Sequence, residues 1–182
     1  SWNWIGSLEK ANGKKEEALE AYEKEKEILE ELTEKEAENL TWKHDLSISW
    51  RNIGNLKRAR DNHKEALEAC EKEKEIMEEL IKKNPRKLLW KGQLAKNWAL
   101  IGISEKALGK KENTLLAYKR MQKIFKEIVE EKPENSKGKR NLAISWREIG
   151  KLEKSLGKKE EALEAYEKEK EIIEELVEKE PK

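Results

Sequence analysis

The sequence predicts an all-α protein built as a solenoid of antiparallel helix pairs, and three observations support this. Tryptophan recurs every 48 residues, at Trp2, Trp50, Trp98 and Trp146. Within each 48-residue unit, apolar residues fall three and four positions apart, as they do on one face of an α-helix. Runs of β-branched residues that alternate at period two are absent. Repeats that each contain two helical patterns are typical of proteins that stack helix pairs.

The repeat divides one predicted domain, residues 1–182, into about four units. Each tryptophan is followed at the same offset by an Ile-Gly pair: Ile5-Gly6, Ile53-Gly54, Ile101-Gly102 and Ile149-Gly150. Further on come Ala18, Ala66, Thr114 and Ala162, and four residues beyond these stand Tyr22, Cys70, Tyr118 and Tyr166. The predicted units cover approximately residues 1–37 (with a truncated first helix), 41–85, 87–133 and 136–182, and the last three close at Pro85, Pro133 and Pro181.

Each unit begins with a first helix, predicted in the second unit over residues 41–60 with Thr41 as its N-cap. Its apolar stripe consists of Trp42, Leu46, Trp50, Ile53 and Leu56. Helix breakers then predict a short turn, at Asn12-Gly13, Asp61-Asn62, Gly109 and Gly157. The second helix is predicted over residues 64–83, with its inward face formed by Ala66, Ala69, Cys70, Ile76, Met77 and Leu80. Its other faces carry Glu and Lys at i,i+4 spacing, which suits a solvated surface.

The segment WREIGKLEKSLGKKEEALEAY, which contains Trp146, Gly157 and Tyr166, resembles the tetratricopeptide repeat. The resemblance extends over essentially the whole chain and implies a right-handed superhelix of helix pairs. Three features depart from the family pattern. The period is 48 instead of 34 residues. The tyrosine expected after the Leu-Gly pair is replaced by Glu9, Lys57, Glu105 and Glu153, and the small residue expected late in the second helix is replaced by Glu25, Glu73, Met121 and Glu169.

Most of the repeated residues are predicted to pack the core. The tryptophans and tyrosines lie on the buried stripe, where aromatic rings supply much contact area. The glycine of each Ile-Gly pair lets neighbouring helices approach closely. Cys70 takes the place of a tyrosine, so we interpret it as a small core residue and not a nucleophile.

Composition excludes several classes of protein. The chain has 40 basic and 39 acidic residues, 43% of its length, and a formal charge of +1. This balance argues against a self-repelling disordered tail and against a generally basic nucleic-acid binder. No apolar run reaches the roughly 18 residues that a membrane span needs, and no signal-peptide pattern opens the chain. A single cysteine favours a reducing compartment, and hence a cytoplasmic location.

The residues needed for catalysis or cofactor binding are missing from the sequence. The two histidines, His44 and His63, lie in different elements without partners at metal-ligand spacing. No glycine-rich phosphate loop or nucleophile elbow occurs. We therefore expect no enzyme activity, no cofactor and no metal.

The charges divide by helix type. Residues 41–60 carry five Lys or Arg against one Asp, whereas residues 14–38 carry five Lys against eleven Glu. In the resembled family the first helices line the concave surface, which implies a basic groove here. Family groove positions lie one, five and eight residues after the tryptophan: Asn3, Ser7, Lys10, Arg51, Asn55, Arg58, Ala99, Ile103, Lys106, Arg147, Lys151 and Lys154.

Two interpretations of this basic surface remain open. Guanidinium groups and an apolar patch at Ala99 and Ile103 could bind an acidic peptide. Alternatively, the basic first helices only complement the acidic second helices. Nucleic acid is an unlikely partner, because no groove aromatic beyond Trp4 suits base stacking. Trp4 itself is left unexplained by the repeat.

The ends of the sequence suggest a fragment, an ordered core or an engineered array, because the first unit has a short first helix. The stripe formed by Ile173, Leu176 and Val177 is expected to be partly uncovered, which predicts head-to-tail contact between copies. The leading functional hypothesis is a scaffold that binds a protein or peptide. The alternatives are a regulatory or sensor segment of a larger signalling protein or enzyme, and a self-stacking or designed module.

Overall fold

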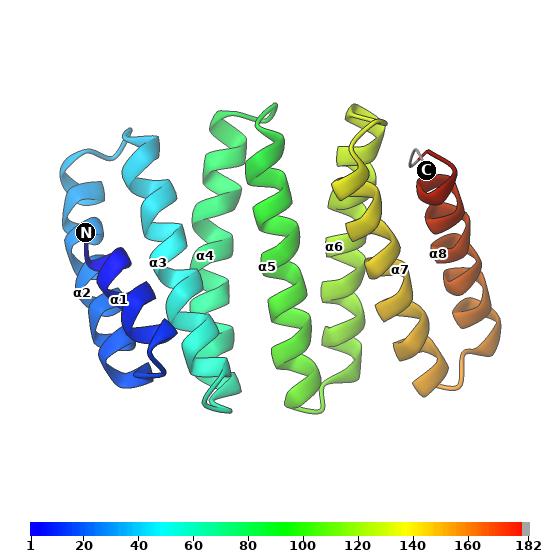
Figure 1. Ribbon diagram of the computed structural model, residues 1–182, viewed down its shortest axis with the longest axis horizontal. Coiled ribbons are helices and arrows are strands. Elements are labelled where there is room, and N and C mark those ends of the chain that lie inside the picture. The colour runs from blue at the N-terminus through cyan, green and yellow to red at the C-terminus, as the bar shows by residue number, and fades with distance from the viewer. Residues whose placement is uncertain (180–182) are drawn as a thin grey trace. The chain divides into compact units, whose positions relative to one another are not determined.

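Eight α-helices and no strand make up residues 1–179, the part of the chain that the computed structural model describes (Figure 1). The predicted all-α fold of paired helices is confirmed. The helices belong to two compact units, unit 1 (Ser1–Lys87) and unit 2 (Leu88–Lys182). The single domain and the repeat boundaries stay predictions, and the boundary at Pro181 lies outside the described residues.

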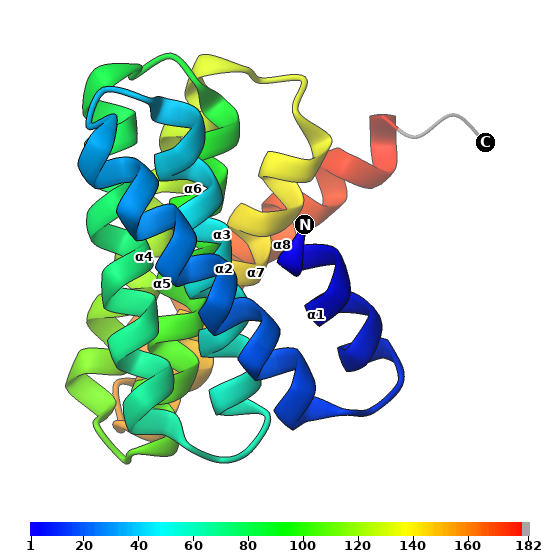
Figure 2. The ribbon, with the colours of Figure 1, turned by 90° about the vertical axis from the view of Figure 1, so that its left-hand side faces the viewer.

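Unit 1 contains two helix pairs. Its helices are α1 (Trp2–Ala11), α2 (Lys15–Lys35), α3 (Leu40–Arg58) and α4 (His63–Lys83). Each helix packs against the next along the chain, and α1 is much shorter than the others (Figure 2). The core of this unit joins Ala18 and Tyr22 of α2 to Ile53 and Leu56 of α3. The apolar stripes predicted for both helix types therefore face inward.

Unit 2 repeats the arrangement with four full-length helices. They are α5 (Leu88–Ala107), α6 (Lys111–Glu131), α7 (Ser136–Ser155) and α8 (Lys159–Lys179). The first helices α3, α5 and α7 begin at Leu40, Leu88 and Ser136, so their starts are 48 residues apart. A core of Met121, Phe125 and Ile128 on α6 packs against Ala95 of α5 and Leu142 of α7.

Asparagine, and not threonine, caps the first helices α3 and α7. The prediction of Thr41 as N-cap is wrong, because α3 begins one residue earlier, at Leu40. Asn39 Oδ1 instead accepts hydrogen bonds from the backbone N–H groups of Thr41 and Trp42, at 3.1 and 3.2 Å. Asn135 caps α7 in the same way, accepting from the N–H of Gly138 at 2.9 Å. Both residue types are good caps, so composition alone did not distinguish them.

The turns between paired helices need a left-handed residue. Gly13, Gly109 and Gly157 have φ of 79°, 75° and 79°, and the second pair has Asp61 at this place with φ of 58°. The N–H of the following residue reaches back to a helix carbonyl, as in the 3.0 Å bond from Asn62 to Lys57. This bond closes a Schellman-type end, for which glycine is preferred because it has no Cβ.

Asp61→Gly should therefore raise the stability of the chain. Removing a Cβ from the left-handed region relieves about 1 kcal/mol, partly offset by the extra freedom of glycine in the unfolded chain. We expect a net gain of roughly 0.5 kcal/mol in the free energy of unfolding, measured by urea denaturation. The matched variant Gly109→Asp places an aspartate at the equivalent turn and should lower stability by a similar amount. A loss of stability in Asp61→Gly would contradict this reading of the turn.

Three glycines of the Ile-Gly pairs allow a tyrosine ring to lie directly on the first helix. A Cβ built on Gly102 would lie 2.5 Å from Cε1 of Tyr118, and one on Gly6 would lie 2.7 Å from Cε1 of Tyr22. Gly150 meets Tyr166 in the same way, at 2.8 Å. No side chain fits at such distances, so the predicted close approach of the helices is confirmed.

In the second helix pair, smaller side chains make the equivalent contact. Cys70 replaces the tyrosine, and a Cβ on Gly54 would meet Ala69 Cβ at 3.3 Å and Cys70 Sγ at 3.6 Å. Cys70 is fully buried, as predicted for a core residue. Burial, and next the nearby Glu73 carboxylate, raise the pKa of the thiol to about 12. The reactive thiolate is therefore scarce at neutral pH.

Candidate functional site

The predicted groove residues of unit 1 lie on α1 and α3, and one of them is engaged inside the fold. Arg51 Nε donates a 2.6 Å hydrogen bond to Glu73 Oε1 on α4, and Nη2 lies 2.5 Å from the same oxygen. The Glu73 side chain has no exposed surface, whereas 23% of the Arg51 side chain is exposed. Because a buried carboxylate needs a cation, Arg51 serves the packing of α3 on α4.

Among the other predicted groove residues of unit 1, some bond to each other and some are exposed to solvent. Arg58 Nη2 donates to Asn55 Oδ1 at 2.8 Å, so these two side chains hold each other on α3. Asn3 on α1 is partly buried, and Lys10 and Ser7 are exposed there. Ser7 Oγ lies 3.2 Å from the hydroxyl of Tyr22. Trp4, which the repeat leaves unexplained, is 78% exposed on the same helix.

In unit 2 the predicted residues lie on α5 and α7. Arg147 Nε is 3.6 Å from Glu169 of α8, and Lys151 Nζ donates to Glu148 Oε1 at 2.7 Å. Lys106 and Lys154 are exposed at the ends of their helices, and neither has a carboxylate within ion-pairing distance among residues 1–179. Ala99 is partly buried and Ile103 is 42% exposed.

The arginines one residue after the tryptophan are matched to the second helix of their own pair. Arg51 pairs with Glu73 and Arg147 with Glu169, each 22 residues apart. In the third predicted unit the equivalent residues are Ala99 and Met121, which pack in one apolar cluster. The pairing with arginine accounts for two of the glutamates that depart from the family pattern, Glu73 and Glu169, whereas Glu25 of the first unit accepts a 2.9 Å hydrogen bond from Ser1 Oγ. For Arg51 and Arg147, the structure favours the interpretation in which basic first helices complement acidic second helices.

A second set of lysines on the first helices makes ion pairs within their own helix pairs that we did not predict from the sequence. Lys43 pairs with Glu79, Lys91 with Glu131, and Lys139 with Glu175. Each joins the start of a first helix to the end of the second helix of its pair. The signal was present in the sequence as a lysine recurring at 48-residue spacing, but the acidic partner comes from helices with many glutamates. Sequence spacing therefore could not single it out.

The described part of the chain offers neither a cluster of metal ligands nor a membrane-spanning helix. Residues 1–179 contain no cluster of three or more His, Cys, Asp or Glu side chains placed to hold a metal ion. No helix among these residues has the length and apolar character required to cross a bilayer.

Two segments of this chain match a known protein family. Residues 1–28 and 143–175 match the family model of the tetratricopeptide repeat. These segments are tetratricopeptide repeats. They include the first and last Trp, Ile-Gly and Tyr of the series, so the resemblance predicted from those residues is confirmed. Tetratricopeptide repeats generally form protein-interaction scaffolds and are typically not catalytic. The match does not test the 48-residue period.

Solved structures show the same helical architecture. The crystal structure of BtubC (BKLC) from P. vanneervenii superposes with a TM-score of 0.71 and 14% sequence identity, covering all of this chain and 65% of that one. At this identity the likeness concerns the fold alone, and the chain spans only 65% of the length of that protein.

Two further solved structures are similar at lower scores. MamA gives a TM-score of 0.49 with 15% identity, covering 96% of this chain and 97% of that one. A putative kinesin light chain from Podosopora anserina, described as having nearly identical TPR-like repeats, gives 0.38 with 16% identity and coverage of 94% and 92%. No curated protein matches the sequence.

Proposed function

We propose that this tetratricopeptide repeat chain is a non-catalytic scaffold that binds an acidic protein or peptide on its first helices. One observation carries the proposal. Lys106 on α5 and Lys154 on α7 are exposed and have no carboxylate partner among the described residues. Ile103 lies one turn before Lys106 and exposes an apolar side chain on the same face. Exposed cations beside an apolar contact suit a peptide that carries both carboxylates and aliphatic groups.

The predicted residues divide into two roles within this proposal. Arg51 and Arg147 form ion pairs with the second helix of their own pair. Only the solvent-exposed part of each side chain is therefore left to contact a partner. Contacts with a partner are assigned to the remaining predicted positions: Asn3, Lys10, Asn55, Arg58, Ala99, Ile103, Lys106, Lys151 and Lys154. We also propose a cytoplasmic location, because a single cysteine suits a reducing compartment.

Charge reversal at the two unpaired lysines tests the proposal without disturbing the core. Lys106→Glu/Lys154→Glu should weaken binding of an acidic partner roughly 10- to 100-fold, because two favourable charges become repulsive. The partner is captured from a lysate on the immobilised wild-type chain, and its affinity for each variant is then measured by calorimetry at two salt concentrations. Arg51 is left intact, because its reversal would disturb Glu73 and unfold the local packing.

The matched control reverses two exposed lysines on a second helix. Lys111→Glu/Lys123→Glu on α6 makes the same change in net charge and should leave the affinity unchanged. Equal binding of the wild type and Lys106→Glu/Lys154→Glu would contradict the proposal. Sedimentation at several concentrations separates partner binding from head-to-tail association of copies. Exposed Ile173 and Val177 on α8 are the expected contacts for that association.

A further inference from the structure

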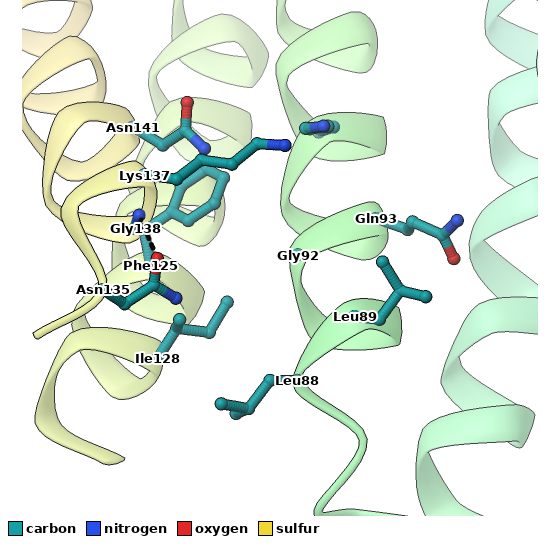
Figure 3. A pocket seen from close by; sticks show the side chains of 11 residues that line it. Leu88, Leu89, Gly92, Gln93, Phe125, Ile128, Asn135, Lys137, Gly138 and Asn141 are labelled. Atoms are coloured by element: carbon teal, nitrogen blue, oxygen red, sulfur yellow. Dashed lines mark hydrogen bonds between the residues drawn. The ribbon is translucent and has the colours of Figure 1, made fainter. Parts of the chain in front are cut away.

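Unit 2 contains a cavity that the predicted groove residues do not line. Its volume is about 190 Å³, and it lies between α5, α6 and α7 (Figure 3). Leu88, Phe125 and Ile128 form its apolar wall, and Phe125 and Ile128 are each only 3% exposed. Figure 3 shows Leu88 pointing from α5 toward the gap, and Lys137 extending from α7 toward α5.

Two positions that line the cavity and carry large side chains in other units are glycine here. Gly92 corresponds to His44 and Arg140, and Gly138 corresponds to Trp42 and Trp90, at 48-residue spacing. A leucine at position 89, where Thr41 and Lys137 stand in the neighbouring units, adds an apolar group at the rim. Leu89 is 62% exposed.

Packing and backbone geometry give no reason for Gly92. It lies inside α5, its φ is not positive, and a Cβ there would meet only Ile128 Cδ1, at 4.0 Å. Glycine inside a helix is unfavourable compared with alanine. Gly92 therefore differs from Gly102 on the same helix, whose Cβ would collide with Tyr118. What Gly92 provides is open space above an apolar wall.

The charges around the cavity have one sign. Lys96 and Lys137 line it, no acidic residue does, and neither ammonium has a carboxylate within ion-pairing distance in residues 1–179. Other cavities of the chain are different, since Glu65 and Glu68 line one in unit 1. Asn141 adds a side-chain amide at the rim, which can donate to and accept from a peptide backbone.

We propose that this cavity binds one aliphatic or aromatic side chain of an acidic peptide segment. An apolar cavity of roughly 150 Å³ accepts benzene, so the volume suits a leucine or phenylalanine side chain. Lys96 and Lys137 attract carboxylates on the flanking residues of the peptide. The inference rests on the proposed scaffold function and adds a specific anchoring site. The α5 and α7 residues of this site precede Trp98 and Trp146, whereas the predicted groove positions follow them.

Short capped peptides test the site directly. Each peptide has three acidic residues on either side of a central position occupied by Leu, Phe, Gln or Lys. In ¹⁵N-correlated NMR spectra of the full chain, the Leu and Phe peptides should shift the amide signals of Gly92 and Gly138. They should bind roughly tenfold or more tightly than the Gln peptide. No saturable shift at peptide concentrations up to about 1 mM, or equal binding of all four, would overturn the proposal.

Filling the cavity gives the complementary test. Gly92→Leu should abolish the difference between the Leu and Gln peptides, because the new side chain occupies the site. Gly92→Ala is the matched control, since its small Cβ leaves most of the space open and should keep the preference. Lys96→Gln/Lys137→Gln should weaken all the acidic peptides and reduce their salt dependence while preserving the preference for Leu.

These results also separate the cavity from the wider proposal. If the captured partner is lost by Lys106→Glu/Lys154→Glu but binds Gly92→Leu as tightly as the wild type, the scaffold function stands and the anchoring site is refuted. Suppose instead that the captured partner binds Lys106→Glu/Lys154→Glu and Gly92→Leu as tightly as the wild type while the peptides bind the cavity. In that case the cavity stands as a peptide site and the proposed contacts at Lys106 and Lys154 are refuted. Circular dichroism of each variant confirms that the helices remain folded.

Discussion

Arg51→Ala should lower the free energy of unfolding of the chain by about 3 kcal/mol. The substitution removes the cation that lies against the fully buried Glu73 carboxylate, while the carboxylate itself stays in the interface between α3 and α4. A buried charge that loses its partner is one of the most destabilising changes that a single substitution makes. Urea denaturation followed by circular dichroism measures the loss as a lower transition midpoint.

The chain supplies both the control and the rescue for this prediction. Arg147→Ala removes the equivalent cation from Glu169, but that pair is longer, at 3.6 Å, and 44% of the Arg147 side chain is exposed. We expect its loss to be below about 1 kcal/mol. The double variant Arg51→Ala/Glu73→Met copies the apolar pair of Ala99 and Met121 and should recover most of the stability. A double variant as unstable as Arg51→Ala would show that the ion pair is not the cause.

Gly102→Ala should lower the free energy of unfolding by about 2 kcal/mol, although alanine is the better helix former. The added methyl group would lie 2.5 Å from Cε1 of Tyr118, so either the ring or the helix must move. Overpacking of this kind outweighs the roughly 1 kcal/mol that alanine contributes to helix propensity. Thermal and urea denaturation should both report the loss.

Gly54→Ala is the matched control, because Cys70 replaces the tyrosine in that pair. The closest atom there is Ala69 Cβ at 3.3 Å, so we expect a change smaller than about 1 kcal/mol. A double-mutant cycle with Tyr118→Cys isolates the contact: Gly102→Ala should cost far less in the Tyr118→Cys background than in the wild type. Equal costs in the two backgrounds would mean that the ring is not the obstacle.

The fold could be predicted from the sequence because its repeated residues each have one strong physical role. A tryptophan, a glycine beneath a tyrosine and a left-handed turn residue recur at fixed offsets, and together they specify a first helix, a close contact and a reversal. The exact ends of the helices were harder to predict, as the wrong N-cap prediction at Thr41 shows. Both Asn39 and Thr41 can cap a helix, and only the backbone geometry distinguishes them.

The site could be predicted less well, for a reason that Arg51 illustrates. Its position identified a first-helix surface, but spacing could not show whether its guanidinium faces a ligand or its own second helix. The glutamate that decides this, Glu73, lies in a helix where every second or third residue is acidic. The cavity beside Gly92 was equally hidden, because a glycine left open and a glycine pressed against a ring look alike in a sequence.

The second helix pair has Arg51 and Glu73 where the third pair has Ala99 and Met121. A whole helix pair can therefore be moved between these two places, whereas a single helix cannot. Grafting α5 in place of α3 would set Ala99 against Glu73 and leave a buried carboxylate without its arginine. Grafting α3 in place of α5 would push Arg51 onto Met121. Moving α3 together with α4, or α5 together with α6, keeps each match intact. Recombination between the second and third pairs, by duplication or by design, is therefore expected to tolerate cut points between pairs and to reject those within one.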